Sequence, residues 1–151
     1  MARLQIYNPR ERAAVALADA ALAPIGWLRR RPRADAPVRR VLLLRLERIG
    51  DLLMVIEAIR DARRLWPDAE IDLAVGSWNA PLARLIPDVT RLQIADAPWL
   101  ARESGASWRA LLSQARAWRQ AHYDLVINFE PDIRSNLLAW ISGASECSVI
   151  A

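Results

Sequence analysis

The sequence predicts an α/β protein, with a Rossmann-like parallel β-sheet, flanking helices and a separate N-terminal helix before them. Three observations support this fold class. From residue 40 onward, short apolar segments recur about every 20–35 residues, helical patterns fill the intervals, and proline or glycine marks the junctions. Repeated strand–helix–strand units build parallel sheets, because a right-handed crossover returns the chain to the same edge of the sheet.

The predicted strands are short runs rich in branched apolar residues. The first, VLLLRL, is almost continuously apolar, as is typical of a buried strand, whereas the second, EIDLAVG, alternates at its start. The five strands are expected at residues 41–46, 70–76, 91–95, 123–129 and 147–151.

Helical spacing of apolar residues predicts four helices between these strands. Pro81 is expected in the first turn of the second helix, Pro67 and Pro87 are expected to end the first two, and Gly143 is expected to cap the last. The four helices are expected at residues 51–65, 80–86, 107–121 and 132–142.

Residues 1–38 are expected to form an N-terminal amphipathic helix and a basic linker, distinct from the sheet-forming domain at 39–151. Residues 10–31 have the pattern of an alanine-rich helix, and an arginine cluster with Pro32 and Pro37 follows it. Residues 1–48 contain 11 arginines and 4 acidic residues, whereas the remainder contains 10 arginines and 13 acidic residues. This basic arm is expected either to lie on an anionic membrane surface or to pack on protein.

The composition excludes several classes of protein. The chain is 54% hydrophobic and 25% charged, as in globular proteins, and 151 residues suffice for one domain with a core. The single cysteine, Cys147, and the single histidine, His122, exclude a disulfide framework and metal-ligand spacing, so no metal is expected and His122 is interpreted as surface or structural. The chain has no apolar run of membrane-spanning length and no secretory signal pattern, which favours a cytoplasmic location, free or peripheral on the inner face of the membrane.

Two turns are predicted to carry the chemistry of this fold. In doubly wound sheets, ligands bind at the carboxyl ends of the strands, where the strand order reverses. The turn at 47–51 follows the first strand and the turn at 130–134 follows the fourth. With the usual strand order these strands are neighbours, so both turns are expected to line one crevice.

The first turn lacks the sequence of a nucleotide-phosphate loop. Gly50 stands alone where a dinucleotide fingerprint needs three glycines, and the chain has no lysine for a P-loop. A carboxylate at Asp51 would also repel phosphate at the helix N-terminus. No cofactor is therefore expected here.

Asp51 has two interpretations from local sequence. Aspartate is a preferred N-cap residue, and Gly50 before it is the default residue for a positive φ. Glu47 and Arg48 could form a solvated ion pair. The other interpretation is that Asp51 acts in chemistry at the strand end. The two roles are compatible, since one carboxylate oxygen can hold the helix amide while the other faces the crevice.

Three segments carry a resemblance to a known family: RLERIGD after the first strand, WPDAEIDLAVGSWNAPL, and YDLVINFEPDIRSNLLAWISGA. From about residue 40 to its end, the chain resembles glycosyltransferase family 9, the ADP-heptose:lipopolysaccharide heptosyltransferases. Such enzymes have two Rossmann-like domains in the GT-B arrangement, and this chain is similar to the N-terminal, acceptor-binding one. The resemblance implies metal-independent, inverting transfer from a nucleotide sugar such as ADP-heptose to a lipopolysaccharide-core or related glycan. The donor would be bound mainly by a C-terminal domain absent from this chain, so we expect a fragment that is inactive alone.

The resemblance also implies roles for individual residues. Asp51 matches the proposed general base, and Arg134 matches a basic position that could bind acceptor phosphate or carboxylate. Asp132 is expected to cap its helix. The full set assigned to acceptor binding is Arg48, Gly50, Asp132, Arg134 and Trp78. Trp99 is a further candidate platform for a sugar, whereas most of the other tryptophans are expected in the core.

The sequence departs from the family pattern in both turns. Where relatives often have Thr-Thr-Pro, this chain has Val55-Ile56-Glu57, and where they have an aspartate and then Gln-Gly-Asp, it has Asn128 and then Glu130-Pro131-Asp132. The departures leave the acceptor and the transferred sugar open.

A different class of function remains as an alternative. The chain could be a non-catalytic Rossmann-like binding module, docked to a membrane or a partner protein through its basic arm, with Asp51 only a cap. Nucleic-acid binding is not expected, since the arginines lie in a linker without interleaved aromatic residues and no recognised binding motif is present.

Overall fold

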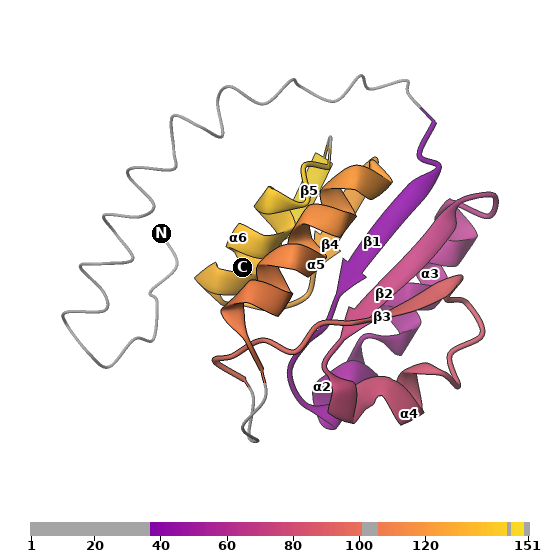
Figure 1. Cartoon of the computed structure of the whole chain (residues 1–151). Coiled ribbons are helices and arrows are strands. Elements are labelled where there is room, and N and C mark those ends of the chain that lie inside the picture. The colour runs from indigo at the N-terminus through magenta and orange to yellow at the C-terminus, as the bar shows by residue number, and fades with distance from the viewer. Residues whose placement is uncertain (1–36, 101–105, 145, 150–151) are drawn as a thin grey trace, which may run out of the picture.

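The computed structural model describes residues 37–100, 106–144 and 146–149, and these build a five-stranded parallel sheet with helices on both faces (Figure 1). The order of the strands is β3-β2-β1-β4-β5. The predicted α/β, Rossmann-like fold class is therefore confirmed. The helix expected at 10–31 lies outside the described residues.

The five predicted strands are present at the predicted places, with bounds that differ by up to two residues. They are β1 (Arg40–Leu44), β2 (Glu70–Val75), β3 (Arg91–Ile94), β4 (Leu125–Asn128) and β5 (Glu146–Val149). The connecting helices are α2 (Ile49–Met54), α3 (Ile56–Leu65), the 3-10 turn η1 (Ser77–Asn79), α4 (Ala80–Ala83), α5 (Trp108–Ala121) and α6 (Ile133–Ile141).

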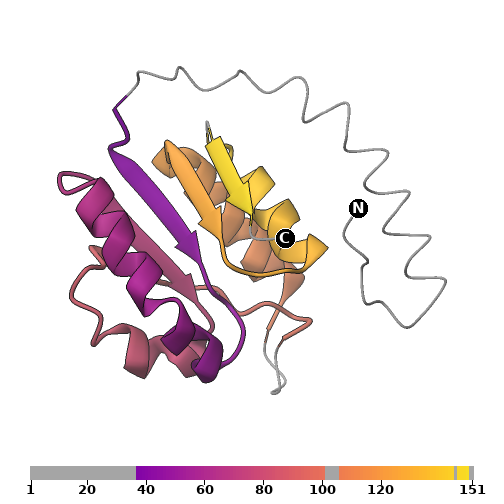
Figure 2. The same ribbon diagram turned by 180° about the vertical axis from the view of Figure 1, so that it is seen from behind.

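Two apolar cores lie on opposite faces of the sheet, as the two views in Figures 1 and 2 show for the helices. Leu42 and Leu44 of β1 face α5 and α6, where Trp118 is almost completely buried. Val41 and Leu43 face α2, α3 and α4. Because successive residues of a strand point to opposite faces, a sheet covered on both sides needs the nearly continuous apolar run seen in β1.

The strand order reverses between β1 and β4. β1 pairs with β2 on one side and with β4 on the other, and Leu44 lies level with Ala74 and with Asn128. The turns after β1 and β4 therefore start side by side at the carboxyl edge of the sheet. The expectation that these two strands are neighbours is confirmed.

The single helix predicted at 51–65 is wrong, because the structure has two helices with a break at Val55. Val55 has φ −98° and ψ 0°, and its N–H bonds to the carbonyl of Leu52 in a tighter turn. Val55 and Ile56 are both β-branched and have weak helix propensity, which lowers the cost of a break there. The first helix also begins at Ile49, two residues earlier than predicted.

Left-handed residues end two helices. Gly143, with φ +71°, follows α6, so the predicted cap is confirmed. His122, with φ 54°, ends α5 and is exposed, in agreement with its interpretation as a surface or structural residue. Cys147 is half-buried in β5 and packs against the core beneath α6.

A buried polar cluster joins β2, β3 and α5. The hydroxyl of Tyr123 donates to Asp72 at 2.6 Å, and the amide of Gln93 donates to the same carboxylate oxygen at 2.7 Å. The side-chain oxygen Oε1 of Gln93 accepts from Nε1 of Trp118 at 2.8 Å. Burial, together with the hydrogen bond to Asp72, raises the pKa of Tyr123. These bonds compensate for an aspartate placed inside a strand.

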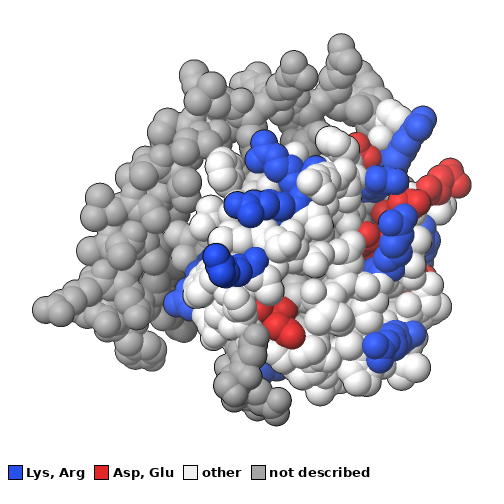
Figure 3. Space-filling model, in the orientation of Figure 1, with Lys and Arg blue, Asp and Glu red and all other residues white. Residues whose placement is uncertain are grey.

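The charged side chains are unevenly placed on the described surface. Figure 3 shows arginine side chains over α5, whose exposed arginines are Arg109, Arg116 and Arg119, and mixed charges near the edge strand β3. None of the helices in the described ranges has both the length and the apolarity to cross a bilayer.

Candidate functional site

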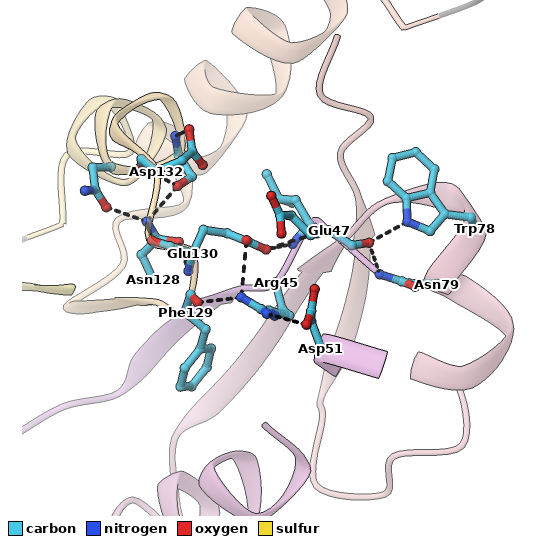
Figure 4. Close-up of polar contacts among 12 residues, drawn as sticks. Arg45, Glu47, Asp51, Trp78, Asn79, Asn128, Phe129, Glu130 and Asp132 are labelled. Carbon is cyan, nitrogen blue, oxygen red and sulfur yellow. Dashed lines mark hydrogen bonds and ion pairs between the residues drawn. The ribbon is translucent and has the colours of Figure 1, made fainter. Parts of the chain in front are cut away.

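The carboxylate of Glu130 connects the turn after β4 to the turn after β1. Its Oε1 atom accepts hydrogen bonds from the backbone N–H groups of Leu46, at 2.6 Å, and Glu47, at 3.0 Å (Figure 4). The side chain of Glu130 is 0% exposed. The two predicted turns are thus joined by a buried side chain of one and the backbone of the other.

Arg45, at the end of β1, lies between two carboxylates. Its Nη1 atom donates to the carbonyl of Phe129 at 2.5 Å and to Oε2 of Glu130 at 3.2 Å. Its Nη2 atom lies 3.4 Å from Oδ1 of Asp51. Figure 4 shows the resulting row of charges, Glu130, Arg45 and Asp51, across the carboxyl edge of the sheet. Asp51 is the outer member, and its side chain is 33% exposed.

Burial raises the pKa of Glu130 above its ordinary value of 4.5. The hydrogen bond from Glu47 and the charge of Arg45 act in the opposite direction and offset part of this effect. The result is a carboxylate whose charge is stabilised mainly by one arginine and by the first turn.

The interpretation of Asp51 as an N-cap is wrong. The N-cap residue of α2 is Arg48, which has extended backbone and no capping side-chain hydrogen bond, and the carbonyl of Arg48 accepts from the N–H groups of Asp51 and Leu52. Because the helix begins earlier than predicted, Asp51 is its third residue. Its carboxylate still benefits from the positive end of the helix dipole, but its side chain pairs with Arg45 instead of a helix amide.

Gly50 does not have the positive φ that its position suggested, since among the described glycines only Gly143 does. Gly50 lies inside α2, and a Cβ atom built there would have no neighbour within 4 Å. Neither backbone geometry nor packing within the described domain requires a glycine at this position.

The first turn is fixed from its other side by η1. The carbonyl of Glu47 accepts from Nε1 of Trp78, at 2.6 Å, and from Nδ2 of Asn79, at 2.8 Å. The ring of Trp78 also packs so closely on Gly76 that a Cβ atom there would clash with it. Trp78 therefore supports the turn. The solvated ion pair that Glu47 and Arg48 could form is not present within the described residues, and Arg48 is exposed.

Asn128 and Asp132 fix the second turn. Nδ2 of Asn128 donates to Ser135, at 3.0 Å, and to Asn136, at 2.6 Å. The side-chain oxygen Oδ1 of Asn128 accepts from the backbone N–H of Glu130 at 3.1 Å. Asp132 accepts from the N–H groups of Arg134 and Ser135, so its predicted role as the cap of α6 is confirmed.

Arg134 and Trp99 are brought together beside this turn. The guanidinium of Arg134 lies 5.7 Å from the centre of the Trp99 ring, a cation–π geometry, and Trp99 also packs on Trp108 at 5.3 Å. Trp108 is 55% exposed, so the expectation of a core position is wrong for it, although it holds for Trp118. The contacts of Trp99 reduce the ring surface that a sugar could use.

Sequence reasoning missed Arg45 and gave Glu130 no role in the site. One signal was available for Arg45, since it interrupts the apolar run of β1 and a charge in a buried strand requires a partner. The partner could not be identified from sequence, because Glu130 is 85 residues away. In the described part of the chain, no cluster of histidine, cysteine and acidic residues is suited to a metal.

No protein-family model and no curated protein matches the sequence. Among solved structures, a glycosyl transferase of family 9 from Veillonella parvula DSM 2008 superposes with a TM-score of 0.60 and 18% identity, over 72% of this chain and 30% of that one. The ADP-heptose lipopolysaccharide heptosyltransferase II of E. coli superposes with a TM-score of 0.59 and 21% identity, over 73% of this chain and 30% of that one. The E. coli heptosyltransferase WaaC with ADP superposes with a TM-score of 0.53 and 21% identity, over 74% of this chain and 35% of that one. The chain therefore shares its Rossmann-like fold with one part of these glycosyltransferases and spans about a third of their length.

Proposed function

We propose that this chain is the acceptor-binding half of an inverting, GT-B glycosyltransferase, and that Asp51 is its general base. The observation that carries the proposal is the position of Asp51 at the strand-order reversal, partly exposed and held by Arg45 through one oxygen. The similarity in fold to solved heptosyltransferases supports the reaction class.

In the proposed reaction, the acceptor hydroxyl oxygen attacks the anomeric carbon of a nucleotide sugar. The bond from that carbon to the phosphate oxygen breaks, and the nucleoside diphosphate leaves with the bonding electrons. The hydroxyl proton passes to Asp51, and the configuration at the anomeric carbon inverts. A carboxylate helps mainly late in the reaction, when bond formation has made the hydroxyl proton acidic.

The donor is proposed to bind mainly to a second domain. In Rossmann folds, the backbone N–H groups after the first strand are the usual ligands of a nucleotide phosphate. Here Glu130 already occupies the N–H groups of Leu46 and Glu47. The sequence resemblance favours ADP-heptose as the donor and a lipopolysaccharide-core or related glycan as the acceptor.

Arg48 and Arg134 are the proposed ligands for an anionic group of the acceptor, because both are exposed and each lies beside one of the two turns. The open space beside Gly50 would admit the acceptor close to Asp51. Asp132 and Trp78 take part in this proposal mainly by fixing the turns. We further propose that the basic N-terminal arm makes peripheral contact with the inner face of the cytoplasmic membrane, where a glycolipid acceptor would be found.

The test is Asp51→Asn in the longer polypeptide that this proposal requires, with ADP-heptose and a lipopolysaccharide-core acceptor. Loss of the base should lower kcat by about 100-fold or more, whereas donor affinity should stay unchanged. Steady-state kinetics and calorimetric donor titration give both readouts. Near-normal turnover would contradict the assignment of the base. Absence of turnover in the parent polypeptide itself would favour the alternative, a non-catalytic binding module.

A further inference from the structure

We propose that Arg45 is the positioning residue of Asp51 and that buried Glu130 holds Arg45 in place for this role. The inference rests on the proposed function, since it gives Asp51 the role of base. It assigns a task to Arg45 and Glu130, two charged residues that the structure buries at the carboxyl edge of the sheet.

The two terminal nitrogen atoms of Arg45 have different partners, one set holding Arg45 and the other being Asp51. Nη1 contacts two oxygen atoms on the β4 side, the carbonyl of Phe129 and Oε2 of Glu130. Nη2 is left for Oδ1 of Asp51, at 3.4 Å. Because the guanidinium is planar, fixing Nη1 on β4 also fixes the direction of Nη2. The side chain of Arg45 is only 11% exposed, so this geometry is maintained by packing.

Glu130 is itself held by contacts that do not involve the side chain of Arg45. Its Oε1 atom is bound by the backbone of Leu46 and Glu47, and only Oε2 faces Arg45. The contacts therefore form a closed path. It leads from the backbone of the first turn to Glu130, then to Arg45, and then to Asp51 in α2, the helix that begins four residues after Arg45. Such a closed arrangement restricts Asp51 more than a single exposed ion pair would.

The arrangement also selects the oxygen that reacts. Oδ1 of Asp51 faces Arg45, so Oδ2 is the atom proposed to accept the proton. The charges of Glu130, Arg45 and Asp51 sum to −1, because the arginine neutralises one of the two carboxylates. The remaining negative charge lies at the outer, partly exposed end of the row.

Buried ion pairs are weak evidence for a purely structural role. Replacing a buried pair with apolar residues of similar volume is often neutral or stabilising. The bonds of Glu130 to Leu46 and Glu47 join the two turns, but they do not require the ion pair with Arg45, whereas orientation of Asp51 does. The chain offers a matched control in Arg40, at the opposite end of β1, whose Nε atom lies at the same 3.4 Å from a carboxylate, that of Glu70.

The experiment is a double-mutant cycle between Arg45 and Asp51 in the longer polypeptide, with ADP-heptose and a lipopolysaccharide-core acceptor as probes. Arg45→Gln should lower kcat by about 30-fold or more, with KM for the acceptor changed by less than about threefold. Arg45→Lys should recover at least part of the lost kcat, and Arg40→Gln should leave kcat within about twofold. In the Asp51→Asn background, Arg45→Gln should cause no further loss, because a positioning residue acts through the base.

A second variant guards against misfolding. Arg45→Gln alone leaves Glu130 buried without its cation, so Arg45→Gln is combined with Glu130→Gln, which removes the second charge and keeps the size of that side chain. This double variant should unfold at a midpoint near the parent value and still show the loss of kcat.

The outcomes separate the two proposals. Parent-like kcat in the folded double variant, or an additional loss from Arg45→Gln when Asp51 is already Asn, would overturn the positioning role and leave Asp51 as the base. Full activity of Asp51→Asn would overturn the role of Asp51 as the base and this inference with it, whereas absence of transfer by the parent polypeptide would overturn the proposed function.

Discussion

At the scale of single residues, Glu130 shows how two opposing effects act on one carboxylate. Removal from water disfavours its charge, while Arg45 and two backbone N–H groups favour it. Burial is the larger effect, so its pKa in the folded protein lies above the ordinary value. This direction has a measurable consequence for stability.

The raised pKa of Glu130 makes the stability of the folded protein depend on pH. Between the ordinary pKa of 4.5 and the raised pKa of the folded state, the folded protein binds more protons at this site than the unfolded chain. The contribution of Glu130 is therefore largest below this window and is lost as pH rises through it. Relative to Glu130→Gln, the unfolding free energy of the parent should fall as pH increases from about 4 to about 7.

Urea unfolding of both proteins at several pH values measures this difference. Glu57→Gln serves as the control, because Glu57 is exposed and pairs with Arg60 on the surface of α3. A parent that gains stability over Glu130→Gln with rising pH would show that the arginine and the amides outweigh burial.

At the scale of secondary structure, α2 determines where Asp51 points. The helix starts at Ile49, so Gly50 and Asp51 belong to its first turn. The fold does not explain a glycine there, since Gly50 has no positive φ and no close neighbour. Glycine in a helix is normally less favourable than alanine.

Gly50→Ala is therefore expected to raise the free energy of unfolding by up to about 1 kcal/mol. Gly143→Ala should have the opposite effect, a loss of about 1 kcal/mol, because φ is +71° there and a Cβ atom would lie 3.2 Å from Cγ of Arg119. Urea titrations of the two variants compare the positions directly. Destabilisation by Gly50→Ala would mean that this glycine has a structural role in α2.

Most secondary structure could be predicted from sequence because its causes are local. Apolar runs, Pro81, Gly143 and Asp132 predicted the strands, a helix start and two helix caps correctly. The start of α2 could not be read in this way. Asp51 has the residue type of an N-cap, but its carboxylate pairs with Arg45, and the N-cap position falls on Arg48, whose side chain makes no capping hydrogen bond.

At the scale of the whole molecule, the order of the strands creates the candidate site. The sequence predicted that the turns after β1 and β4 are neighbours, and the pairing of these strands confirms it. The same sequence could not predict which side chain joins the turns. Glu130 reaches two N–H groups more than 80 residues earlier, and only the sheet register determines that distance.

The proposed function predicts that these 151 residues alone transfer no sugar. The chain spans 30–35% of the solved glycosyltransferases that share its fold, and the turn after β1 has its N–H groups occupied by Glu130. Incubation with ADP-heptose and a lipopolysaccharide-core acceptor, followed by mass spectrometry, should detect no product. The same acceptor should nevertheless bind, with weaker binding for Arg134→Gln. Product formed by this chain alone would show that no second domain is needed.

The link between Glu130 and the first turn also has a consequence for folding. Its hydrogen bonds to Leu46 and Glu47 close loops of 84 and 83 residues. Contacts between such distant residues form late, because the entropy of loop closure opposes them until the intervening elements have folded. A nascent chain can pair β1, β2 and β3 before β4 has been synthesised, but Arg45 then lacks the partner that orients it. An ordered Asp51 is therefore a sign that the long-range topology is complete, and partly folded chains would not present the proposed base.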